Sequence, residues 1–167
     1  MHTPLPTPRT RRPVLATALL LAGMSAGSHA AEFVLGAGPS TTSTHNYVTH
    51  AVFLDGHGGR RTHGPVTWQP MLSLGWIDGR DKARLENDAF VVAGGVHLVD
   101  WWRRAFFSFQ FGLAHDTNDA LSSHGQFVSS IGWQGDRVVY TLRHISNGKV
   151  FSGPNLGETM LLVGLRF

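Results

Sequence analysis

The sequence contains no cysteine, carries few charges and has only one apolar run of any length. The missing cysteines exclude a disulfide framework, a thiol nucleophile and a thiolate metal site. Charged residues make up only 15% of the chain. The apolar run, residues 14–24, is too short for a membrane-spanning helix, which needs roughly 20 apolar residues. The sequence therefore does not predict a helical membrane protein.

Residues 1–30 have the three-part layout of a secretory signal peptide. Three arginines between residues 9 and 12 precede the apolar run, and small residues lead to Ala30, after which we expect cleavage. These arginines account for the whole formal net charge of +3, because the remaining chain holds eleven basic and eleven acidic residues. A balanced chain gives no reason to expect nucleic acid as a partner. We expect one exported domain, residues 31–167.

After residue 30, apolar and polar residues alternate over short stretches. In residues 107–113, three phenylalanines and a leucine alternate with Ser108, Gln110 and Gly112. Successive side chains of a strand point to opposite faces, so such a stretch predicts a strand with one apolar and one polar face. We expect eight strands, near 32–39, 45–54, 66–76, 89–101, 104–116, 123–133, 137–147 and 158–167.

Strands of this kind favour an all-β fold, an eight-stranded antiparallel transmembrane β-barrel of the outer membrane. A tilted transmembrane strand needs about 9–11 residues, and an even strand number places both ends of the chain in the periplasm. Lipid offers no hydrogen bonds to a free strand edge, so only a closed sheet can span it. The connections 103–104 and 134–136 are short, as periplasmic turns are, whereas 77–88 and 148–157 are longer, as outer loops are. The connection 55–64 is long for a periplasmic turn.

Aromatic residues also favour a membrane barrel. The five tryptophans lie at the ends of expected strands, where the interface of a bilayer would hold them. Leu161, Val163, Leu165 and the final Phe167 alternate, which resembles the signal that the barrel-assembly machinery of bacteria recognises. A soluble lipocalin-like barrel or sandwich stays open as an alternative, because alternation alone does not say which face points inward.

One polar pair interrupts the apolar face of the seventh expected strand. His144 and Ser146 are two residues apart, so they share the face that Val138, Tyr140 and Leu142 make apolar. Polar side chains on a lipid-facing wall cost energy and need a reason. A serine hydroxyl is a weak nucleophile until a neighbouring base activates it. His144 and Ser146 therefore form a candidate base and nucleophile at the outer end of this strand.

The segment from His144 to Glu158 resembles the lipid A 3-O-deacylases of the PagL type, through its His-Ile-Ser-Asn, its Pro-Asn and a last strand that ends in Phe. In that family of eight-stranded outer-membrane barrels, the serine follows the histidine by two residues and the glutamate by fourteen, and both spacings match here. The resemblance implies that His144 is the base, Ser146 the nucleophile and Glu158 the acid that orients His144. Strict alternation back from Phe167 places Glu158 on the inward face, so we expect a bulge or loop geometry to redirect it.

The resemblance also implies roles for four residues around the serine. Asn147 matches the asparagine that follows the family's serine, and Asn155 resembles a second asparagine of the oxyanion site, although it lies one residue late. We expect oxyanion donors among Asn147, Asn155 and backbone amides such as that of Gly148. Lys149 is available to pair with a lipid A phosphate.

The function implied by the resemblance is hydrolysis of the ester-linked 3-O-acyl chain of lipid A, with release of a 3-hydroxy fatty acid at the outer leaflet. The substrate would be lipopolysaccharide, and no cofactor is implied. We expect no metal site, because the histidines are scattered without paired ligand spacing. A non-enzymatic barrel for structure or adhesion stays open, as does another lipid enzyme such as a phospholipase or an acyl transferase. The sequence does not fix the oligomeric state, and a homodimer stays open.

Overall fold

The computed structural model describes residues 31–43, 47–100, 102–115, 118–147 and 156–167. The expected signal peptide lies outside these residues. Within the described ranges no helix is long and apolar enough to cross a membrane. The regular structure consists of antiparallel strands: β1 (Glu32–Thr42), β2 (Val48–His57), β3 (Arg61–His63), β4 (Val66–Ile77), β5 (Ala89–Val99), β6 (Ala105–His115), β7 (Gly125–Gln134), β8 (Val138–Asn147) and β9 (Glu158–Arg166).

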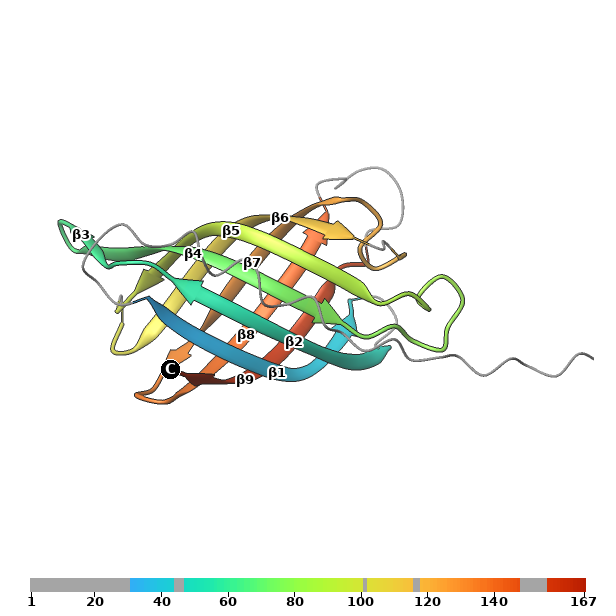
Figure 1. The fold of residues 1–167 in the computed structure, drawn as a ribbon, viewed down its shortest axis with the longest axis horizontal. Helices are drawn as coiled ribbons and strands as arrows, with labels where there is room; N and C mark the ends of the chain where they lie inside the picture. Colours follow the sequence, from blue (N-terminus) through green and yellow to red (C-terminus); the bar gives the residue numbers. More distant parts are fainter. Residues whose placement is uncertain (1–30, 44–46, 101, 116–117, 148–155) are drawn as a thin grey trace, which may run out of the picture.

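Eight of these strands close into one barrel (Figure 1). Each long strand pairs with a strand on either side, and the pairing of β1 with β9 completes the ring. The short β3 pairs with the first residues of β4, and the remainder of β4 pairs directly with β2. The expected eight-stranded antiparallel barrel is confirmed, and the long connection 55–64 is explained by the hairpin that β3 forms with β4.

The two ends of the barrel differ in their connections. The short turns β5–β6 and β7–β8, the β3–β4 hairpin and the carboxyl terminus lie at one end (Figure 1). The last residues of β4, β6 and β8 and the first residues of β5, β7 and β9 lie at the opposite end, which we call the outer end. Strand β8 therefore runs from the short-turn end toward the outer end, and His144 and Ser146 come near its finish.

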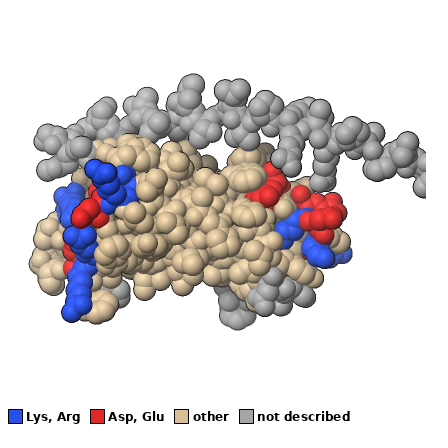
Figure 2. All heavy atoms as spheres, turned by 90° about the horizontal axis from the view of Figure 1, so that it is seen from below, with Lys and Arg blue, Asp and Glu red and all other residues tan. Residues whose placement is uncertain are grey.

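The apolar faces of the strands point away from the barrel. On β6, Phe109 and Phe111 are 45% and 56% exposed, whereas Ser108 and Gln110 between and beside them are completely buried. On the face seen in Figure 2, charged side chains gather at the two ends, and the described residues of the band between them are uncharged. This orientation is the opposite of the one expected for a lipocalin-like soluble barrel, which turns its apolar faces inward.

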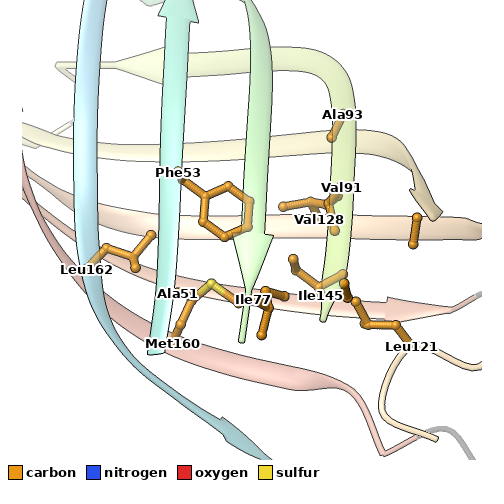
Figure 3. Close-up of a cluster of buried hydrophobic side chains, with 12 residues drawn as sticks. Ala51, Phe53, Ile77, Val91, Ala93, Leu121, Val128, Ile145, Met160 and Leu162 are labelled. Carbon is orange, nitrogen blue, oxygen red and sulfur yellow. The ribbon is translucent and has the colours of Figure 1, made fainter. Parts of the chain in front are cut away.

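The interior is filled by an apolar cluster and by ion-paired polar groups. Side chains such as Phe53, Ile145 and Met160 meet inside the barrel (Figure 3). Beside them the buried Arg143 on β8 donates through Nη2 to Oδ2 of Asp55 on β2, at 2.7 Å, and its guanidinium lies 4.5 Å from the centre of the Phe53 ring. A buried charge needs such a partner. The pair also joins β8 to β2 through the interior, past β9 and β1, which lie between them in the sheet.

Candidate active site

Strand β8 presents His144 and Ser146 on the outer wall of the barrel. Both side chains are partly exposed, whereas Arg143, Ile145 and Asn147 between and beside them are buried inside. The alternation of the strand thus places the candidate base and nucleophile on one face, as the sequence predicts. Along the same face, nearer the middle of the barrel, the strand carries exposed apolar side chains, so the pair adjoins the uncharged band.

The imidazole of His144 is held in place by β9. Its Nδ1 lies 2.9 Å from Oγ1 of Thr159, the residue opposite it in the β8–β9 pairing. The ring also lies against Gly157, where an added Cβ would come within 2.9 Å of the ring carbon Cε1 and 3.3 Å of Nε2. Within the described ranges Nε2 makes no hydrogen bond. A ring held through Nδ1, with no hydrogen bond at Nε2 among the described residues, can act as a general base at Nε2 if Nδ1 carries the hydrogen.

Ser146 lies next to His144 on this face without a hydrogen bond between their side chains in the described part of the chain. Such bonds are often long in the absence of substrate and tighten when it binds. A second serine also faces outward here, because Ser129 on β7 is the residue opposite His144 in the β7–β8 pairing. The histidine therefore has hydroxyl-bearing neighbours on its own strand and on both adjacent strands.

Glu158 does not reach the outer wall of the barrel, so the expected redirection by a bulge or loop geometry is wrong. The carboxylate is completely buried inside the barrel, where Arg80 donates to both its oxygens at 2.7 and 2.9 Å and Ser40 Oγ donates to Oε2 at 2.6 Å. The ladder between β8 and β9 runs without interruption through Glu158. Regular pairing therefore keeps the side chain on the inward face that alternation dictates.

The side chain of Asn147 also faces the interior. Its Nδ2 donates to Oγ of Ser122 at 2.6 Å, and the residue is 1% exposed. An amide on the inner face points away from Ser146, so the described geometry gives it no part in an oxyanion site. The remaining residues to which the resemblance gives roles lie outside the described residues: Gly148, Lys149 and Asn155.

Thr159 is the site residue that sequence reasoning missed. The signal for it was present, because the alternation that puts Glu158 inside puts its neighbour Thr159 outside, beside Leu161 and Val163. What the sequence lacks is the register of β9 against β8, which brings the threonine opposite His144. Among the described residues, no group of three or more His, Asp or Glu side chains is placed to hold a metal ion.

Comparisons with protein-family models, with curated proteins and with solved structures found no match. The fold therefore follows from the strand pairing itself, and the resemblance to lipid A deacylases stays a prediction from the segment that begins at His144.

Proposed function

We propose that this protein is an outer-membrane serine esterase that hydrolyses the ester-linked 3-O-acyl chain of lipid A. One observation carries the proposal: an imidazole held through Nδ1, with no hydrogen bond at Nε2 among the described residues, lies on the same outward face as a serine two residues away on a closed barrel. A catalytic pair on an outer wall next to an apolar surface is accessible to a substrate embedded in lipid. The resemblance of the His144 segment to lipid A deacylases specifies the ester.

A location in a membrane is supported by the surface of the barrel. The outward faces of the strands carry many exposed apolar side chains, such as Phe109, Phe111 and Leu113, and monomeric soluble proteins rarely present so many apolar groups together to water. At the short-turn end, three arginines lie over tryptophan rings, an arrangement suited to an interface where apolar and charged surroundings meet. Their guanidinium carbons are 5.1–5.9 Å from the ring centres: Arg61 over Trp68, Arg103 over Trp102 and Arg104 over Trp133.

The orientation of the barrel determines which lipid the site meets. With the short turns in the periplasm, His144 and Ser146 lie toward the external leaflet, and lipid A is the lipid that forms this leaflet. Phospholipids occupy the opposite leaflet, near the end of the barrel that carries the short turns. The position of the pair along β8 thus supports lipid A over a phospholipid as the substrate.

The proposed reaction is an acyl transfer through Ser146. Its Oγ attacks the ester carbonyl while Nε2 of His144 takes the hydroxyl proton. The tetrahedral intermediate collapses by breaking the bond to the sugar oxygen, and His144 gives this oxygen the proton. His144 then deprotonates a water molecule that attacks the acyl–Ser146 ester, and it returns this proton to Oγ of Ser146 as the fatty acid leaves. A single oxyanion donor contributes about 3 kcal/mol to such a step, and by the resemblance the Gly148 amide and Asn155 are the candidates.

The proposal is tested by mass spectrometry of lipid A from cells that produce the wild type, Ser146→Ala or Ser129→Ala in equal, folded amounts. We expect the wild type and Ser129→Ala to remove one hydroxyacyl mass and Ser146→Ala to remove none. The Ser129 variant is the matched control, because it removes a hydroxyl from the same outward face.

Each other outcome identifies a different function. Lipid A that stays unchanged with the wild type contradicts the deacylase and supports a structural barrel. A mass gain indicates an acyl transferase, and lysophospholipids indicate a phospholipase. Activity that survives in Ser146→Ala but not in Ser129→Ala identifies Ser129, and not Ser146, as the nucleophile.

A further inference from the structure

We propose that Thr159, rather than Glu158, is the residue that positions the His144 imidazole for catalysis. The inference rests on the proposed esterase and concerns how its base is held. The distance of 2.9 Å between Nδ1 of His144 and Oγ1 of Thr159 is that of a hydrogen bond, and the two residues are directly opposed on neighbouring strands. Two neighbouring strands thus fix both members of the contact.

The chemistry of the imidazole determines what this contact does. Only the nitrogen without a proton accepts the hydroxyl proton of Ser146, so Nδ1 has to carry the hydrogen if Nε2 is the base. With Oγ1 of Thr159 as acceptor, Nδ1–H donates, and the ring is held both in this tautomer and in its orientation. A threonine thereby fills the orienting role that a carboxylate fills in many serine hydrolases. It differs from a carboxylate by adding no negative charge beside the imidazolium that forms.

Glu158 is committed to a different task. Both its oxygens accept hydrogen bonds from Arg80, whose side chain is almost completely buried, and Ser40 adds a third. Turning the carboxylate to the outer wall would leave the Arg80 guanidinium buried without its counterion, which is strongly unfavourable. Arg80 belongs to the connection 78–88 and also donates through Nε to the carbonyl of Tyr47. Glu158, the first residue of β9, therefore anchors the connection 78–88 through Arg80, on the inner side of the wall that carries His144.

The experiment compares the mature chain, refolded in detergent micelles that contain lipid A, with Thr159→Val and Thr159→Ser. Valine has nearly the shape of threonine without the hydroxyl, and serine keeps the hydroxyl. We expect Thr159→Val to lower kcat by about tenfold or more with little change in KM, since a misoriented base loses much of the hundredfold or larger effect of general base catalysis. Thr159→Ser should keep most of the activity. A purely structural role for Thr159 would affect the folded fraction instead of this split.

Glu158→Gln is the competing variant, and its activity is measured per folded barrel. If Thr159→Val keeps the kcat of the wild type while folded Glu158→Gln loses it, Glu158 orients His144 and the proposal is overturned. If Thr159→Val and Glu158→Gln lose kcat equally, and Thr159→Ser loses as much as Thr159→Val, the hydroxyl of Thr159 does not orient His144. This result also overturns the proposal.

A spectroscopic measurement separates this proposal from that of the function. Nitrogen-15 NMR of the refolded chain reports the tautomer of His144, whose signals are identified by their loss in His144→Gln. We expect protonated Nδ1 in the wild type and in Thr159→Ser, and loss of this preference in Thr159→Val. An unchanged tautomer in Thr159→Val overturns the proposal, even if the wild type hydrolyses no lipid A and the proposed function fails by itself.

Discussion

At the scale of single residues, the backbone of Gly157 leaves space for the His144 ring. This glycine has a φ of +62°, and an added Cβ would lie 2.9 Å from Cε1 of His144 and 3.1 Å from the carbonyl oxygen of Ile145. We expect Gly157→Ala to lower the free energy of unfolding by about 1–2 kcal/mol, because residues with a Cβ are strained in this region. The same substitution should displace the ring and lower kcat/KM on lipid A, measured in detergent micelles.

Gly64→Ala separates the two effects of that substitution. Gly64 has a nearly equal φ of +58°, but a Cβ added there meets no atom within 4 Å. It should therefore lose similar stability and keep its activity. A comparable loss of activity in both variants would show that strain in the backbone, and not contact with His144, is responsible.

At the scale of the strands, the ion pair between Arg143 and Asp55 joins β8 to β2 through the interior. Arg143 is completely buried, and its Nε also donates to Oγ of Ser130 at 3.0 Å. We expect Arg143→Met to destabilise the barrel by about 3–5 kcal/mol, because it leaves the Asp55 carboxylate buried without its counterion, with the hydroxyl of Ser73 as its remaining hydrogen-bond donor. Urea unfolding in detergent micelles, followed by tryptophan fluorescence, measures the loss.

An exposed pair provides the control for this measurement. Arg104 lies 3.0 Å from Asp136 at the short-turn end, where both side chains are at least half exposed. Arg104→Met should cost less than about 1 kcal/mol, since such surface pairs are screened by water. Equal losses in the two variants would contradict the strand-joining role of Arg143.

The sequence predicted the strands well because each strand has a period of two, which is a local property. It also placed His144 and Ser146 on one face for the same reason. The short β3 was missed because three residues, Arg61–His63, carry no visible alternation and are ordered only by pairing with β4. The ion pair of Arg80 with Glu158 was out of reach as well, since nothing in the sequence of a loop indicates that one of its side chains enters the barrel.

Glu158 shows where two kinds of sequence reasoning conflict. Its spacing from His144 favoured the outer wall, whereas alternation along the last strand favoured the interior, and the strand pairing follows alternation. Spacing along the chain says little about which face a side chain takes when an intervening connection has an unknown path. The geometry of a strand fixes the face directly, so it is the stronger guide.

At the scale of the whole molecule, the apolar band predicts a strong dependence on depth for charged substitutions. Phe109 lies in the middle of β6 on the outer face, and Val48 lies at the first residue of β2, also exposed. In lipid vesicles we expect Phe109→Arg to cost about 2–4 kcal/mol of folding free energy and Val48→Arg about 1 kcal/mol or less. Denaturant titration of folding into the vesicles measures both. Small and equal effects would favour a barrel that faces water.

The position of His144 and Ser146 on the outer wall determines how molecules arrive and depart. A site inside a barrel is supplied through its mouth, so its occupancy follows the concentration of a solute per volume. This pair faces sideways, so in the proposed esterase an ester would reach it by lateral diffusion in the plane of the leaflet, and the freed acyl chain would leave the same way. The quantity that governs its encounters is then the number of ester-bearing molecules per area of membrane around the barrel.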